Sequence, residues 1–180
     1  DTVERGLRVF LAATKADDDV RVVVTGPKGA LSGMNAGAIL VDHTTASAQV
    51  AREMSAATSA VGVQFLDAPV SGGQAGAENG KLTIMVGGAE ADVERARPVL
   101  AAMGRSITHM GPIGAGQATK AVNQVILAGN YLGVAEGMVL AIKSGLDPEK
   151  VVAALSGGAA RSWVLENRSG RMIADDYPLG

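Results

Sequence analysis

Two short stretches carry residues whose types and spacing could do chemistry. The first is DAPVSGG at 67–73, where Ser71 stands before Gly72 and Gly73. A hydroxyl beside backbone N–H groups that no side chain obstructs can cradle an anion such as a carboxylate or a phosphate. Taken alone, an ordinary glycine-rich turn explains this stretch slightly better than an anion site does.

The position of this stretch in a sheet favours a ligand site. The preceding run, VQFLD, has the apolar composition of a buried strand, and Pro69 follows it. Because proline has no N–H to donate to a β-ladder, Pro69 is expected to end that ladder. In open α/β sheets, ligands bind beyond the carboxyl ends of the strands.

The second stretch, GPIGAGQATKAVNQ at 111–124, holds Lys120 about one turn into a long helical segment. Its neighbours Ala118, Ala121 and Val122 are apolar. The helix dipole and an apolar environment both disfavour the ammonium form, so they shift the pKa of Lys120 towards neutrality. A lysine of this kind can act as a general acid or base. A solvated surface lysine is the ordinary alternative.

Asn123 and Gln124 follow Lys120 by three and four residues, which places their amides on the lysine's face of the helix. The same stretch contains Gly-x-Gly, and Glu136 stands twenty residues after Gly116, at the distance of the acidic residue in a dinucleotide-binding fingerprint. It is nevertheless not predicted to be a nucleotide-binding loop, because Thr119 occupies the position of the third small residue and no strand follows the helix.

A serine-hydrolase interpretation of Ser71 also fails, because PVSGG lacks the G-x-S-x-G turn. His43 and His109, the two histidines, are predicted to make local hydrogen bonds at strand ends, since nothing nearby completes a site around either of them. Two isolated histidines also give no support for a metal centre.

The elements that must position these residues alternate between strand and helix up to residue 110. This alternation predicts a doubly wound, Rossmann-type α/β sheet. Strands are expected at 38–42, 63–70, 82–88 and 106–110, with helices at 47–60 and 90–104. A long helix at 116–144 and a helix capped by Asp147 follow, so the remainder is expected to be all-helical.

Composition limits the function classes. The chain has 180 residues, 47% hydrophobic and 19% charged, which is typical of a globular protein. The net charge of −2 and the absence of basic clusters give no support for nucleic-acid binding. With no cysteine, disulfides, thiol catalysis and zinc ribbons are excluded. The opening DTVERG does not predict a signal peptide, and a cytoplasmic location is the default expectation.

The long helical segment has the length of a membrane span, since Glu136 is the only charged residue between Lys120 and Lys143. Charged side chains inside a membrane cost about 2.5–3.5 kcal/mol each. We therefore expect no membrane, and instead a helix buried by other helices. Three glycines at four-residue spacing would allow close backbone approach: Gly129, Gly133 and Gly137.

The two stretches resemble the two signatures of the β-hydroxyacid dehydrogenases, which include 3-hydroxyisobutyrate dehydrogenases and tartronate semialdehyde reductases and, more distantly, 6-phosphogluconate dehydrogenase. DAPVSGGQAGAENGKLTIMVGG (67–88) is similar to the first and GPIGAGQATKAVNQ (111–124) to the second. GAILVDHTT (37–45) resembles the segment before a cofactor-side turn. The resemblance extends over essentially the whole chain.

This resemblance implies roles for particular residues. Lys120 would be the catalytic acid/base. Ser71, Gly72 and Gly73 would bind the substrate carboxylate.

Three further residues take roles from the same resemblance. The amide beside the substrate would come from Asn123 or Gln124, since NQ stands here where the family often has two asparagines. The hydroxyl of Thr45 would lie beside the nicotinamide end of the cofactor, NAD or NADP. The resemblance also implies that VRVVV at 20–24 is helical, although its β-branched composition favours a strand.

The resemblance also implies how the chain is divided. Residues 1–112 would be the C-terminal part of an NAD(P)-binding Rossmann-type domain. Residues 113–180 would begin a helical domain for substrate binding and homo-oligomer formation. The family's first βαβ unit, with its nucleotide fingerprint, is expected before Asp1 and further closing helices after Gly180. Residues 1–180 alone are therefore expected to be inactive.

The implied activity is the interconversion of a small 3-hydroxy acid and its semialdehyde. A 6-phosphogluconate-type decarboxylation is less favoured, because that relative usually carries His–Asn after the lysine where Asn–Gln stands here. Two further interpretations are imine reduction on the same fold and a non-catalytic binding module. Hydride transfer would separate the binding module from an enzyme.

Overall fold

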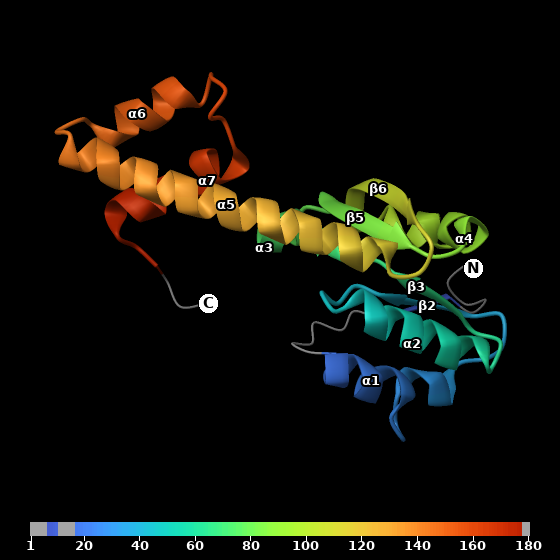
Figure 1. The fold of residues 1–180 in the computed structure, drawn as a ribbon. Coiled ribbons are helices and arrows are strands. Elements are labelled where there is room, and N and C mark those ends of the chain that lie inside the picture. The colour runs from blue at the N-terminus through green and yellow to red at the C-terminus, as the bar shows by residue number, and fades with distance from the viewer. Residues whose placement is uncertain (1–6, 11–16, 178–180) are drawn as a thin grey trace. The chain divides into compact units, whose positions relative to one another are not determined.

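The computed structural model describes residues 7–10 and 17–177. The chain divides into two compact units, Asp1–Ala121 and Val122–Gly180. The first unit contains a sheet with helices, and the second is helical (Figure 1). A Rossmann-like α/β region followed by helices was predicted from the sequence, and this fold class is confirmed.

A six-stranded sheet forms the centre of the first unit, in the order β1-β2-β3-β5-β4 with β6 paired to β5. The first three strands are parallel to one another, and β5 is parallel to β6. However, β5 runs antiparallel to β3 and β4, so the sheet is mixed. Its strands are β1 (Leu7–Phe10), β2 (Ile39–Asp42), β3 (Gln64–Asp67), β4 (Val70–Ser71), β5 (Leu82–Gly87) and β6 (Gly104–Gly111).

The expectation that Pro69 ends the β-ladder is wrong in part. Pairing with β2 does end near Asp67, but β3 and β4 pair with β5 in one continuous register on both sides of the proline. The Met85 N–H donates to the Pro69 carbonyl at 3.0 Å. Proline lacks only the donor, so its carbonyl keeps the antiparallel ladder intact as far as Ser71.

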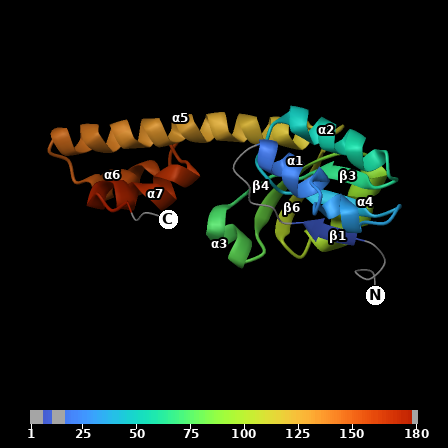
Figure 2. The same cartoon turned by 90° about the horizontal axis from the view of Figure 1, so that it is seen from below.

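Helices cover both faces of this sheet (Figure 1 and Figure 2). On one face, α1 (Asp17–Thr25) and α2 (Ala48–Ser59) pack against a cluster that includes Leu40 and Phe65. On the other face, α4 (Glu90–Leu100) packs against alternate residues of the same strands, among them Val41 and Leu66. Burial on both faces explains why these strands are continuous apolar runs.

The run VRVVV lies in α1, so the helix implied by the family resemblance is confirmed. Three aspartates occupy the first turn, where they interact favourably with the helix dipole. Val20 and Val24, four residues apart, are buried against α2 and the sheet, while Val22 is 66% exposed. Tertiary packing of one helical face therefore outweighs the β-propensity of valine.

The second unit holds most of α5 (Ala115–Lys143), followed by α6 (Pro148–Leu155) and α7 (Trp163–Ala174). Asp147 caps α6 as predicted, accepting from the N–H of Glu149 at 3.0 Å. Ser162 caps α7 in the same way. Sequence analysis placed no element at α7, nor at two short elements of the first unit, the 3-10 turn Ala30–Gly33 and α3 (Gly73–Glu78).

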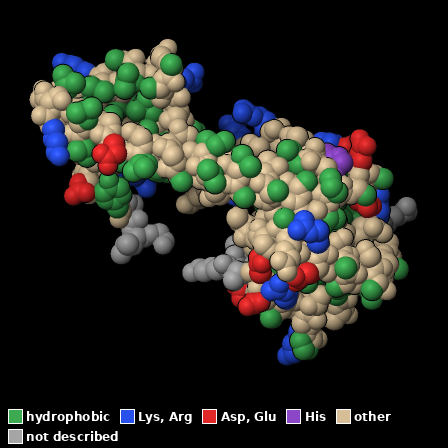
Figure 3. Space-filling model, in the orientation of Figure 1, with side chains coloured by type: hydrophobic (Ala, Val, Ile, Leu, Met, Phe, Trp, Pro, Cys, Tyr) green, Lys and Arg blue, Asp and Glu red, His purple; other side chains and the backbone are tan. Residues whose placement is uncertain are grey.

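The expectation that α5 is buried by other helices is wrong for the part of the chain that the structure describes. By length and composition α5 could cross a membrane, and 11% of its most apolar stretch is buried. Hydrophobic side chains remain on the surface of this unit (Figure 3), among them Val125, Leu132 and Leu140. Only α6 and α7 follow α5 within residues 122–177, and they bury little of it beyond Met138 and Ala141.

Two glycines of α5 provide a test of this packing. A Cβ on Gly116 would lie 2.4 Å from the Met85 carbonyl oxygen, whereas a Cβ on Gly129 would meet no atom of the described chain within 4 Å. We expect Gly116→Ala to destabilise the chain by about 1–3 kcal/mol through overpacking. Gly129→Ala should stabilise it by about 0.5–1 kcal/mol, because alanine is the better helix former.

Urea titration followed by circular dichroism, performed on both variants, measures these changes. Equal effects of the two substitutions would contradict the close approach of α5 to the sheet at Gly116.

Candidate functional site

Lys120 is the centre of the candidate site. Although it is a lysine, only 9% of its surface is exposed. Its Nζ donates to the Val70 carbonyl of β4 at 2.7 Å. Burial lowers the pKa of Lys120 below its ordinary value. The lysine is therefore held against the sheet in an environment that favours the neutral amine.

The cause of this burial differs from the one inferred from the sequence. Ala118, Ala121 and Val122 are all exposed, so they do not surround the lysine. Instead, the lysine side chain lies against β4, the strand that continues beyond Pro69. The expected direction of the pKa shift was correct, but tertiary packing produces it.

Ser71, Gly72 and Gly73 lie directly beyond the residue that Lys120 contacts. Ser71 is the last residue of β4, and α3 begins at Gly73. The φ angles of Gly72 and Gly73 are +130° and +60°, which residues with a Cβ rarely adopt. The first N–H groups of a helix have no partners within it. Ser71 and the glycine turn thus directly follow the residue whose carbonyl Lys120 contacts.

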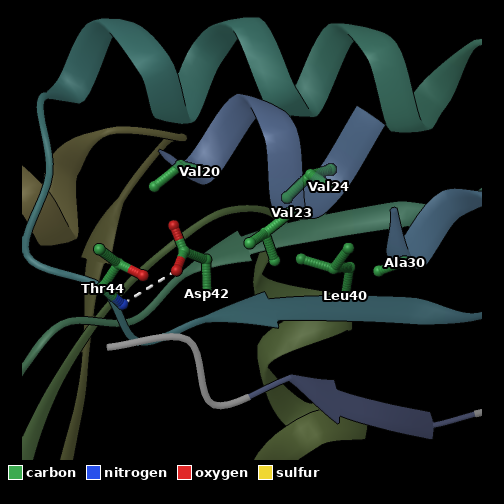
Figure 4. A pocket seen from close by; sticks show the side chains of 7 residues that line it. All are labelled: Val20, Val23, Val24, Ala30, Leu40, Asp42 and Thr44. Atoms are coloured by element: carbon green, nitrogen blue, oxygen red, sulfur yellow. Dashed lines mark hydrogen bonds between the residues drawn. The ribbon is translucent and has the colours of Figure 1, made fainter. Parts of the chain in front are cut away.

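Thr45 lies in the loop after β2, at the carboxyl ends of the parallel strands, and is exposed. Its neighbour Thr44 donates its N–H to Asp42 Oδ1 at 2.9 Å (Figure 4). The figure shows this pair at one end of a small cavity between α1 and β2, lined mainly by valine and leucine. The loop that carries Thr45 is therefore fixed to the end of β2.

Asp67, at the end of β3, holds the start of α5. It is fully buried, and its carboxylate accepts from the N–H groups of Gly114 at 2.7 Å and of Gln117 at 2.9 Å. Desolvation raises the pKa of Asp67, and these N–H donors oppose that shift. The helix that carries Lys120 is in this way attached to the sheet by a carboxylate.

Gln117 connects the same helix to the loop of Thr45. Its side-chain amide donates to the Thr44 carbonyl at 2.6 Å and accepts from the Ala46 N–H at 3.0 Å. Sequence analysis missed both Asp67 and Gln117. The available signal was a charged residue inside an apolar run, LDAP, which suggests a buried carboxylate that needs partners.

Asn123 and Gln124 lie on α5 beyond Lys120, within the second compact unit. The Asn123 side-chain amide donates to Gln124 Oε1 at 2.9 Å. The contact of either residue with substrate therefore stays a prediction.

The two histidines make the local contacts that were predicted for them. His43 Nδ1 lies 2.7 Å from the Ala68 carbonyl, which only accepts, so Nδ1 carries the proton. Burial lowers the pKa of His43. His109 Nε2 lies 2.8 Å from the Gly88 carbonyl. Within residues 7–10 and 17–177, no three His, Asp or Glu side chains are grouped so that they could hold a metal ion.

Comparison with known proteins agrees with this geometry. Residues 1–111 match the family described as the NAD binding domain of 6-phosphogluconate dehydrogenase. Residues 114–180 match the NAD-binding family of NADP-dependent 3-hydroxyisobutyrate dehydrogenase. The chain belongs to the β-hydroxyacid dehydrogenase family. The resemblance seen in the two sequence signatures is thereby confirmed.

Individual relatives cover nearly all of this chain. An uncharacterised oxidoreductase of Shewanella frigidimarina is 51% identical over 98% of the chain and 60% of its own length. A 3-hydroxyisobutyrate dehydrogenase of Mycobacterium tuberculosis, solved with L-serine, is 34% identical, with a TM-score of 0.82 over 96% of this chain and 60% of its own. Psf3, solved with NADP+ and 2-OPP, is 25% identical, with a TM-score of 0.86 over 94% of this chain and 60% of its own.

The chain thus spans about 60% of the length of each of these relatives. The 3-hydroxyisobutyrate dehydrogenase and Psf3 both align over more than nine-tenths of this chain. The β-hydroxyacid dehydrogenase fold therefore covers both of its compact units.

The environment of Lys120 predicts an unusual titration. Because burial disfavours its ammonium form, Lys120 should lose its proton at a lower pH in the folded chain than in the chain unfolded by urea. Carbon-13 NMR of dimethylated lysines measures this, with Lys120→Arg assigning the resonance. An equal titration midpoint in the folded and unfolded chains would show that the lysine is solvated.

Proposed function

We propose that the protein containing this chain is an NAD(P)-dependent oxidoreductase that interconverts a small 3-hydroxy acid and its semialdehyde. The observation that carries the proposal is the buried Lys120, whose Nζ donates at 2.7 Å to the carbonyl of Val70, the residue directly before the Ser71–Gly73 turn. Membership of the β-hydroxyacid dehydrogenase family supports it. The M. tuberculosis relative, whose name specifies 3-hydroxyisobutyrate, suggests the substrate class.

The cofactor site fits the loop after β2. Thr45 is exposed at the carboxyl ends of the parallel strands, where open α/β sheets bind their ligands. When bound there, NAD or NADP supplies a hydride acceptor for oxidation and a hydride donor for reduction. The Thr45 hydroxyl would lie at the nicotinamide end.

Lys120 would move the proton. In oxidation, its neutral Nζ removes the proton of the substrate hydroxyl as the hydride leaves the carbon that bears it. In reduction, the ammonium returns that proton to the carbonyl oxygen. The lowered pKa of Lys120 brings the two protonation states closer in free energy near neutral pH, which general acid–base catalysis requires.

The Ser71–Gly73 turn would hold the substrate carboxylate, with Asn123 or Gln124 as an amide partner. A serine hydroxyl and backbone N–H groups without side chains in the way are suited to an anion. Fixing the carboxylate beside Lys120 orients the carbon that exchanges hydride, and such positioning is a large share of catalysis.

The proposal also includes the division of the chain into domains and its assembly into a homo-oligomer. Residues 1–112 would complete an NAD(P)-binding domain, and residues 113–180 would begin a helical substrate and dimerisation domain. A homo-oligomer through the helical domain would bury the apolar surface of α5, on which Val125 is 74% exposed. A cytoplasmic location accords with these assignments.

Replacement of the lysine tests its role in catalysis. In the full-length protein, Lys120→Met should lower kcat by about 10²–10⁴-fold, the range that general acid–base groups contribute, with cofactor affinity largely kept. Lys120→Arg should also be slow, because a guanidinium does not release its proton in this pH range. Steady-state kinetics with NAD(P)-linked absorbance measures both.

The pH dependence of the two reaction directions tests which protonation state of Lys120 each direction needs. Oxidation needs the neutral amine, so wild-type oxidation should rise as pH increases through the lowered pKa of Lys120, while reduction should fall. A Lys120→Met variant that keeps more than about a tenth of wild-type kcat would rule out the lysine as acid/base. Cofactor binding without any wild-type turnover would indicate a binding module.

Replacement of the serine tests the carboxylate site. A hydrogen bond to a charged group contributes about 1.5–3 kcal/mol. Ser71→Ala should therefore lower kcat/KM for the hydroxy acid by about 10- to 150-fold. Assays with the hydroxy acid and with its amide provide the comparison, and the variant should lose much of the wild-type preference for the acid. An unchanged preference would favour an ordinary glycine turn.

A further inference from the structure

A single buried side chain holds the backbone on both sides of Thr45. Gln117, which is 2% exposed, donates from Nε2 to the Thr44 carbonyl at 2.6 Å and accepts at Oε1 from the Ala46 N–H at 3.0 Å. Its amide thus pairs with the loop as the backbone of a neighbouring strand would. Thr45 itself, between the two bonded residues, is left exposed.

The backbone of Gln117 is also held in place, by the buried carboxylate of Asp67. The backbone N–H of Gln117 donates to Asp67 Oδ2 at 2.9 Å, and Asp67 Oδ1 accepts from Gly114 at 2.7 Å. Asp67 belongs to β3, which pairs in parallel with β2. Gln117 is therefore attached to the sheet through its backbone while its side chain holds the loop.

Lys120 follows Gln117 by three residues on α5, so the two residues are about one helical turn apart. On the loop side, Thr44 is also held through its N–H by Asp42 (Figure 4). A continuous series of hydrogen bonds thus runs from the end of β2, through the loop of Thr45 and Gln117, to the helix that carries Lys120.

We propose that Gln117 is a positioning residue that fixes Thr45 relative to Lys120, so that the nicotinamide end of the cofactor and the proton-transfer group meet the same substrate carbon. The inference rests on the proposed function, because it takes Thr45 and Lys120 as the cofactor and acid/base residues. Glutamine suits this role, since the loop presents one acceptor and one donor and a side-chain amide matches both.

The test compares two glutamines in the full-length protein. Gln117→Met removes both loop bonds at nearly constant volume, and it should raise the dissociation constant of NAD(P) about tenfold and lower kcat. Gln49→Met is the matched control: Gln49 is an exposed residue of α2 that bonds Glu53, and its replacement should change neither value. Fluorescence titration and steady-state kinetics provide the two measurements.

A double-variant cycle with Thr45→Val separates positioning from a general structural role. If Gln117 acts through Thr45, the two substitutions together should weaken cofactor binding little more than the larger single effect. Fully additive losses, or an unchanged dissociation constant in Gln117→Met, would overturn the inference.

Gln117→Glu serves as a second variant should Gln117→Met fail to fold. When protonated, its carboxyl keeps the acceptor for the Ala46 N–H and a donor for the Thr44 carbonyl, whereas the ionised form loses that donor and places a charge at a buried position. The loss of cofactor affinity should therefore grow as pH rises, and it should again be non-additive with Thr45→Val. Normal wild-type turnover with additive effects would overturn the inference alone. Failure of the wild-type protein to bind NAD(P) would overturn the proposed function together with it.

Discussion

The buried carboxylate of Asp67 is the constraint on which the rest of the first unit depends. It joins the end of β3 to the first turn of α5 by accepting the N–H groups of Gly114 and Gln117. These donors lie at the positive end of the helix dipole, which partly offsets the cost of desolvating a negative charge. The arrangement leaves no space for side chains nearby: a Cβ on Gly87 would lie 2.4 Å from Asp67 Oδ1.

The antiparallel ribbon of β3, β4 and β5 provides the second constraint. Because the ladder continues past Pro69, the Val70 carbonyl faces α5 and accepts from Lys120 at 2.7 Å. Had the chain left the sheet at the proline, the lysine would have lost the surface that buries it. One strand extension therefore positions the Ser71–Gly73 turn and also provides the environment that lowers the pKa of Lys120.

Much of this organisation could be predicted from local sequence. The helices at 48–59, 90–100 and 115–143 lie close to their expected ranges, because each is long and has clear ends. The helix containing VRVVV could be predicted only from the family resemblance, since its valines favour a strand when tertiary packing is ignored. The position of Asp67 inside an apolar run indicates a buried carboxylate, but its partners and those of Gln117 could not be predicted, because they lie about fifty and seventy residues away in the sequence.

The exposure of α5 is a second feature that local sequence did not predict. A helix that is hydrophobic on most faces is normally buried, and this was the expectation from its sequence. Within the described chain, α6 and α7 leave residues such as Leu132 and Leu140 more than 60% exposed. Exposed apolar surfaces of this kind mark interaction sites. The proposed homo-oligomer through the helical domain would cover this surface of α5 with a second subunit.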